Sequence, residues 1–185
     1  MGVVIVMTIT SDHKFPKAKS SSFTLVELLV VISIIGLLAG LGLPAINGAI
    51  QAGKKAEVSA MAESIKTAVN AYYAEYSAYP SNASGMTDLI FFNNMCTTTN
   101  TNGGNYRGIA FLEVPPKFTN STSELVTPIG FYPGGARSNF SLAIDTNGAG
   151  VLTNDVGGTK YVVASSVSVW VADPKNSNKP VGTFK

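Results

Sequence analysis

Glu27 is the most unusual chemical group in this sequence of 185 residues, because it is the one charge in an apolar run that extends from Phe23 to Pro44. A carboxylate at the centre of a bilayer costs about 2.5–3.5 kcal/mol on insertion scales, and less near the interface, so such a residue normally has a functional partner. Glu27 is therefore the first candidate functional residue. The alternative is that its side chain only reaches toward the membrane interface.

Side chains suited to acid–base, nucleophilic or metal chemistry are scarce. The single histidine, His13, precedes the apolar run, and the single cysteine, Cys96, cannot form an internal disulfide or a structural zinc site by itself. Cys96 is either a reactive or intermolecular thiol or a partly buried small residue. The sequence therefore does not favour an enzyme, and no cofactor is expected to be required.

Charge is concentrated ahead of the apolar run. The chain has 13 basic and 11 acidic residues, and residues 1–22 contain three of the lysines and one aspartate, so the remainder carries 10 of each sign. Without a basic cluster to bind phosphates, nucleic acid is not expected as a partner. Lys14, Lys17 and Lys19 favour a cytoplasmic N-terminus for the segment that follows.

Two helical segments follow in sequence. Residues from Phe23 to Leu43 would span about 31 Å as a helix, which matches one bilayer core. Residues 45–78 show apolar side chains at spacings of three and four, which predicts an amphipathic helix ending before Pro80. The apolar positions are Ile46, Ile50, Val58, Met61, Ile65, Val69, Tyr73 and Tyr76.

Residues 79–185 are rich in Asn, Gly, Ser and Thr, which predicts loops and a small sheet. A loop is expected at 97–106, and strands are expected at 139–145 and 160–172, the second with alternating β-branched residues. The fold class is therefore α+β, with a long N-terminal helix packed on a small antiparallel sheet. This head domain would comprise residues 45–185.

The segment from Ser20 to Ile32 resembles the N-terminus of type IV pilins and type II secretion pseudopilins. In that family a prepilin peptidase cuts before an aromatic residue and methylates the new amine, which implies a cleaved leader over 1–22 and processing at the Ser22–Phe23 bond. Glu27 matches the family's fifth-position glutamate, although Ser22 stands where glycine is usual. Cleavage would also remove His13.

The resemblance implies a membrane-anchored filament subunit. Glu27 would pair with the Phe23 ammonium of a neighbouring copy, and Gly36 and Pro44 match positions that weaken the helix, although Gly36 and Gly40 could instead form a helix-pairing face. The expected location is the inner membrane, crossed once, with a periplasmic head and a filament after assembly. Expected partners are prepilin peptidase, further copies, other minor pseudopilins, an assembly ATPase, an inner-membrane platform protein and membrane lipid.

The order of elements is closest to the major pseudopilin of type II secretion, whose calcium loop implies oxygen ligands at Asp145, Asn147 and Asp155. The alternative is that Asn147-Gly148 simply forms a turn. Other open functions are a membrane-tethered periplasmic ligand-binding module and a type IV pilin for adhesion or motility. Translation is expected to start at Met7, because Gly2 to Val6 is unusually apolar for such a leader.

Overall fold

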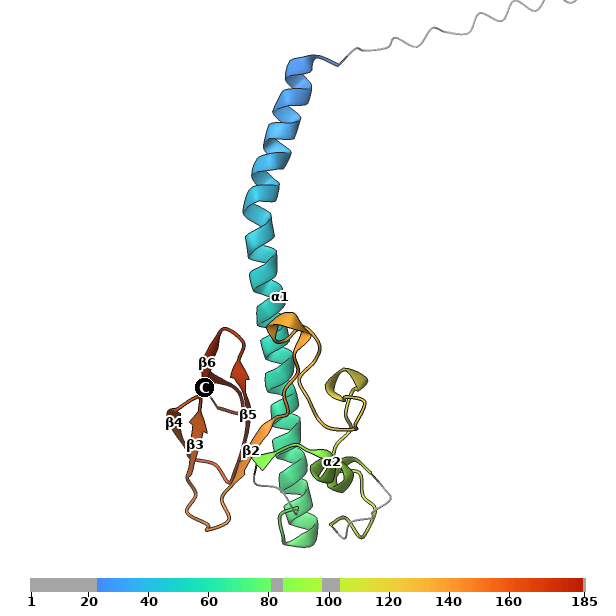
Figure 1. The fold of residues 1–185 in the computed structure, drawn as a ribbon, viewed down its shortest axis with the longest axis vertical. Coiled ribbons are helices and arrows are strands. Elements are labelled where there is room, and N and C mark those ends of the chain that lie inside the picture. Colours follow the sequence, from blue (N-terminus) through green and yellow to red (C-terminus); the bar gives the residue numbers. More distant parts are fainter. Residues whose placement is uncertain (1–22, 81–84, 98–103, 185) are drawn as a thin grey trace, which may run out of the picture. The chain divides into compact units, whose positions relative to one another are not determined.

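The computed structural model describes residues 23–80, 85–97 and 104–184, and the chain divides into two compact units between Pro44 and Ala45 (Figure 1). Helix α1, Leu25–Tyr76, contributes its first part to one unit and its second part to the other. The second unit also holds α2 (Leu89–Cys96), the 3₁₀ turns η1 (Pro116–Phe118) and η2 (Pro133–Gly135), and the strands. These strands are β1 (Gly85–Met86), β2 (Ser141–Ile144), β3 (Leu152–Val156), β4 (Thr159–Val163), β5 (Val167–Asp173) and β6 (Asn176–Gly182).

The long helix ends because the backbone leaves the right-handed region at Ser77, whose φ is 53°. The Ser77 N–H still donates to the Tyr73 carbonyl at 2.8 Å, which satisfies one of the carbonyls left open at a helix end. The helix therefore ends at Tyr76, two residues before the predicted position 78 and ahead of Pro80.

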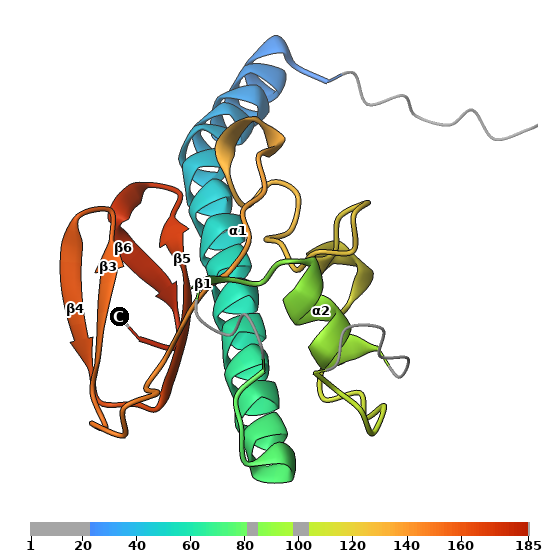
Figure 2. The same cartoon turned by 60° about the horizontal axis from the view of Figure 1, so that its bottom comes forward.

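The second unit has a layered arrangement (Figures 1 and 2). Strands β1-β2-β5-β6 form one antiparallel sheet, and β3 and β4 form a separate antiparallel hairpin. The sheet packs on α1, and the hairpin lies on the far side of the sheet, where the Asn154 Nδ2 donates to the Ser168 Oγ at 2.8 Å. Helix α2 lies on the opposite side of α1 from β6.

One face of α1 supplies the centre of the core. Its buried side chains contact apolar residues of α2 and of the central strand β5, where Val167, Val169 and Val171 point toward the helix. Period-3.6 patterning on the helix and period-2 patterning on the strand therefore meet at one interface. The fully buried members from α1 and α2 are Val58, Ala62, Ile65, Val69, Phe91 and Met95.

The predicted α+β class, a long N-terminal helix with an antiparallel sheet, is confirmed. The strand expected at 139–145 is present as β2, but the single strand expected at 160–172 is wrong, because this stretch forms β4 and β5 in two different sheets. The chain turns at Ser165, whose N–H donates to the Val163 carbonyl at 3.0 Å and whose Oγ donates to the Val167 carbonyl at 2.7 Å. A serine side chain that bonds the local backbone competes with a continuing ladder.

Asn105 is a buried polar centre inside the segment predicted as a loop, 97–106, of which residues 98–103 lie outside the described residues. Its Nδ2 donates to the carbonyls of Asn94, Thr97 and Ile109 at 3.1, 3.3 and 2.6 Å. Its Oδ1 accepts from the Ile109 N–H and from the Tyr76 hydroxyl at 3.1 and 2.7 Å. One amide therefore ties α2 and the following loop to the end of α1.

We expect Asn105→Ala to lower the free energy of unfolding by about 3 kcal/mol, because it leaves several buried polar groups without their partner. The measurement is the denaturant midpoint of the detergent-solubilised protein, followed by near-ultraviolet circular dichroism. Asn70→Ala is the matched control, since Asn70 is exposed on α1 and its loss should change stability by no more than about 0.5 kcal/mol. Equal midpoints for the two variants would show that the Asn105 bonds contribute nothing.

Candidate functional site

The start of α1 is fixed by a capping box formed by Thr24 and Glu27. The Glu27 Oε2 accepts the Thr24 N–H at 2.8 Å and the Thr24 hydroxyl at 2.7 Å, and the Thr24 Oγ1 accepts the Glu27 N–H at 3.2 Å. Such reciprocal bonds satisfy two of the donors that every helix leaves open at its N-terminus. The sequence signal was present as Thr24-Leu25-Val26-Glu27, but Thr24 was not identified as a candidate residue.

The helix surface around Glu27 is apolar on every side and exposed. Its large side chains from Leu25 to Leu41 are all exposed, and α1 is the one helix in the described part of the chain that is long and apolar enough to cross a membrane. The Ser33 hydroxyl donates to the Leu29 carbonyl at 2.7 Å, so this polar group is satisfied within the helix. A segment with these properties needs lipid or other protein around it.

Phe23 lies just outside the helix with 75% of its surface exposed, and it directly precedes the capping residue Thr24. Ser22, the proposed leader over 1–22 and the proposed start at Met7 lie outside the described residues. A cut before Phe23 would therefore place the new amine one residue before the N–H that Glu27 already accepts. The geometry keeps a carboxylate and the expected ammonium at the same end of the helix.

Gly36 and Pro44 lie within α1, which remains helical through both positions. A methyl group added at Gly36 or at Gly40 would meet nothing within 4 Å. Packing within one copy therefore does not require glycine at either place. Each glycine lowers helix propensity by about 0.8–1 kcal/mol relative to alanine, so local weakening in a filament stays a prediction.

The three residues predicted to bind calcium are engaged in local turns. The Asp145 Oδ2 accepts the Gly150 N–H at 2.5 Å, and its Oδ1 accepts the N–H groups of Ala149 and Asn147 at 3.1 and 3.2 Å. The hydrogen bond from Gly150, followed by the others, holds the pKa of Asp145 below its usual range. Asp155 lies in β3 and accepts the Gly158 N–H in the β3–β4 turn.

Among the described residues, no group of three or more His, Cys, Asp or Glu side chains is placed to hold a metal ion. Asp145 and Asn147 share one loop, whereas Asp155 faces a different turn. The structure thus explains the Asp145 and Asn147 loop as a turn closed by a carboxylate. Calcium binding stays a prediction.

Cys96 is half-buried at the end of α2, and burial raises the pKa of its thiol to about 12. A thiol with such a pKa is almost entirely protonated at neutral pH, and the thiolate is the reactive form. Of the two interpretations of Cys96, the structure therefore favours the partly buried small residue.

A protein-family comparison bears on this N-terminal segment. The model described as the prokaryotic N-terminal methylation motif matches residues 17–43, a range that contains the Ser22–Phe23 bond and Glu27. No solved structure matches the chain at significant similarity.

Similar sequences come from fimbrial proteins. A fimbrial protein of Neisseria meningitidis is 42% identical over 60 residues, which cover 32% of this chain and 35% of that protein. Type IV major pilin protein PilE1 of Neisseria gonorrhoeae is 40% identical over 60 residues, covering 32% and 36%. Fimbrial protein EcpC of Eikenella corrodens is 38% identical over 64 residues, covering 35% and 42%.

The chain therefore matches these relatives over little more than a third of their length, and a closer relation to the major pseudopilin of type II secretion is not shown. The chain carries a prepilin-type N-terminal methylation motif and is homologous to type IV pilins over about a third of its own length.

Proposed function

We propose that this protein is a structural subunit of a type IV pilus-like filament, held in the inner membrane before assembly by the first part of α1. The observation that carries the proposal is a carboxylate fixed by a capping box at the start of the first part of α1, whose other large side chains are apolar and exposed. Lipid surrounds this surface in the single copy, and the corresponding helices of other copies surround it in the filament.

Assembly then depends on pairing two charges in an apolar environment. Cleavage before Phe23 creates an ammonium group, and Glu27 of a neighbouring copy supplies its counter-charge. The capping box restricts the Glu27 side chain to few rotamers, so less entropy is lost when the pair forms. Because an unpaired charge is costly there, the pair fixes the axial position of each incoming copy.

Processing and assembly of such a subunit require further partners. A prepilin peptidase removes residues 1–22 and methylates Phe23, and an assembly ATPase with a membrane platform protein drives extension. Other minor pseudopilins would share the filament. The lysines before the helix favour a cytoplasmic N-terminus, which would put the head in the periplasm.

We predict that the mature chain begins at Phe23 with a methylated amine. N-terminal mass analysis of membrane-extracted protein measures this directly. Ser22→Gly should be processed at least as completely as the natural chain, whereas the bulky Ser22→Trp should accumulate as precursor. A natural chain that retains Lys14 to Ser22 in cells with an active peptidase would rule out this processing.

Glu27→Gln should abolish filaments and leave the processed protein in the membrane. Gln still completes a capping box, so the substitution removes the charge and keeps the helix start. An ammonium buried without its partner costs about 3–5 kcal/mol, which is enough to prevent addition of a copy. Sheared filaments and processed membrane protein are quantified in the same cells, and Glu27→Asp should be intermediate because its side chain is shorter.

Thr24→Val is the matched control for this experiment. It removes the capping hydroxyl, at a cost of about 1 kcal/mol to the helix, but keeps the Glu27 charge. Filaments should persist in Thr24→Val, although in lower amount. Equal loss in both variants would mean that helix capping, and not charge pairing, accounts for the role of Glu27.

A pseudopilus serving type II secretion is the second candidate, favoured by one observation. Cys96 is the only cysteine, so the head has no internal disulfide of the kind that adhesive pilins often carry. Removal of the protein should abolish surface filaments and adherence if it forms a pilus. Exported enzymes retained in the periplasm, with adherence unchanged, would indicate the secretion role.

A further inference from the structure

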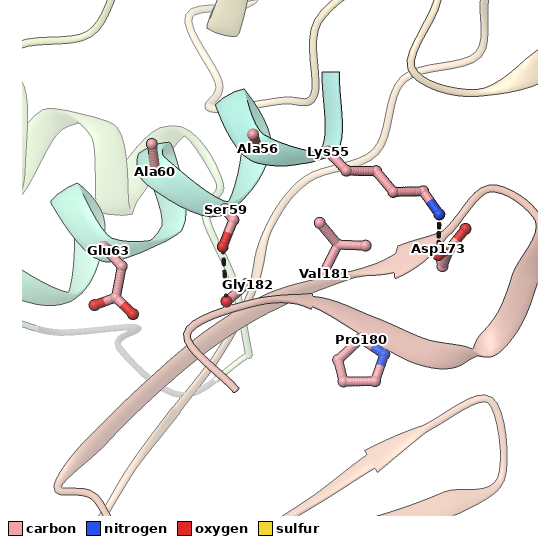
Figure 3. Close-up of a pocket in the computed structure, with 9 residues that line it drawn as sticks. All are labelled: Lys55, Ala56, Ser59, Ala60, Glu63, Asp173, Pro180, Val181 and Gly182. Atoms are coloured by element: carbon pink, nitrogen blue, oxygen red, sulfur yellow. Dashed lines mark hydrogen bonds and ion pairs between the residues drawn. The ribbon is translucent and has the colours of Figure 1, made fainter. Parts of the chain in front are cut away.

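A cavity of about 570 Å³ opens between α1 and the end of β6 (Figure 3). Ala56 and Ala60 line it from the helix with small side chains, and Gly182 lines it from the strand. The Ser59 Oγ donates to the Gly182 carbonyl at 3.0 Å, which holds the two walls together. A methyl group at Gly182 would lie 2.2 Å from the Val169 carbonyl oxygen, so the strand cannot carry a larger residue here.

The rim of this cavity has a negative charge. At one end the Lys55 Nζ contacts the Asp173 Oδ2 at 2.5 Å, and at the other end lies Glu63, which is exposed. Among the described residues, no ion pair involves Glu63. The carboxylates of Asp173 and Glu63 outnumber the ammonium of Lys55, so the rim is complementary to a cationic partner surface.

Ile129, an exposed apolar residue of the same domain, is surrounded by charge of the opposite sign. Ile129 is 74% exposed on a turn in which the Phe131 N–H donates to the Pro128 carbonyl at 3.1 Å. The Lys54 Nζ donates to the Gly130 carbonyl at 2.7 Å, and Phe131 is buried, so the turn is anchored on both sides of the protruding residue.

Cations surround Ile129. Lys54, Lys117 and Arg137 line the hollow beside it, against the single carboxylate of Glu57. Arg137 donates to the carbonyls of Thr127, Thr119 and Lys117, which are neutral acceptors and leave its charge uncompensated. The surface around Ile129 is therefore basic, whereas the rim of the cavity is acidic.

The Ile129 turn and the cavity between α1 and β6 lie beside the same few turns of α1, on opposite sides of the helix. Lys54 and Glu57 mark the Ile129 side, and Ser59 and Glu63 mark the cavity side. At 100° per residue, the two groups of positions are roughly 160° apart around the helix axis. A protrusion and a cavity on opposite sides of one molecule make a heterologous contact that repeats without closing, as a helical filament requires.

We infer that Ile129 of one copy inserts into the cavity between α1 and β6 of the next copy. This inference rests on the proposed filament function and names the surfaces of the head domain that meet in it. The inserted turn brings its basic surroundings against Glu63 and Asp173. Ala56 and Ala60 are small because the incoming turn fills the space above them.

A cysteine pair in the full-length chain tests this contact. Filaments of the double variant Ile129→Cys with Ala60→Cys should give dimers, trimers and higher species on mild oxidation. A disulfide within one copy would leave a monomer on a denaturing gel. Dimers, trimers and higher species therefore report only bonds between copies.

The matched control is Ile129→Cys with Ala71→Cys. Ala71 is exposed on the same face of α1 as Ala60 but roughly 16 Å further along, so this pair should remain monomeric. Single-cysteine variants control for Cys96. Filaments that form without cross-links from the first pair, a product that stops at the dimer, or equal cross-linking by the control would each refute the contact.

A second pair of variants avoids cysteine chemistry. Ile129→Asp should reduce sheared filament about tenfold relative to Ile129→Leu, because it replaces an apolar contact with a charge that the acidic rim repels. Ile129 is exposed, so neither change should alter the unfolding midpoint. Filaments are counted by microscopy in each sample, so equal yields refute this contact alone, whereas an unmodified protein without filaments refutes the filament function and this contact with it.

Discussion

A single helix in this protein must be stable in two different environments, and the other features follow from that constraint. Up to Leu41, α1 carries one charge and exposes apolar side chains in all directions. From Ala45 onward it buries one stripe against α2 and β5, while Ile46, Ile50 and Tyr73 remain exposed outside that stripe. The first part needs lipid or other helices around it, and the second part needs its own domain.

The one charge in the apolar part must therefore be accommodated in every state of the protein. In the single copy, Thr24 gives the Glu27 carboxylate two hydrogen bonds, which offset part of the cost of placing it near lipid. Both bonds end on the Glu27 Oε2. The other carboxylate oxygen, Oε1, can therefore still accept a hydrogen bond from an ammonium group. Capping and pairing are thus compatible roles for one side chain.

Sequence patterns identified the features that depend on composition over many residues. The apolar stretch, the amphipathic continuation and the fold class all follow from periodicity and length, which a single sequence displays directly. The motif around Phe23 and Glu27 was identified because its residues have fixed spacing. These features need no knowledge of which distant segments meet.

Features that depend on distant contacts were missed. The stretch 160–172 alternates throughout, yet Ser165 turns the chain because β4 pairs with β3 and β5 pairs with β2 and β6. Asn105 looked like one more polar loop residue, although its amide joins α2 and the following loop to the end of α1. Thr24 differs from these cases, because the capping signature Thr24-Leu25-Val26-Glu27 is local and can be read from the sequence alone.

The two contacts proposed between copies, the pair of Glu27 with Phe23 and the Ile129 turn in the cavity, involve different parts of α1. Both can form at once only if the spacing between copies is the same at the two places. In the proposed filament, the pair formed by Glu27 and Phe23 would fix the axial position of the membrane part, while the turn around Ile129 would fix the neighbouring head. A stiff helix could satisfy both only if the two spacings agreed closely. Gly40, Gly42 and Pro44 lie between the two contacts, and each weakens the helix locally. No packing within one copy requires Gly40 or Gly42. In the proposed filament, a helix weakened at these positions would let the spacings of the two contacts adjust to each other.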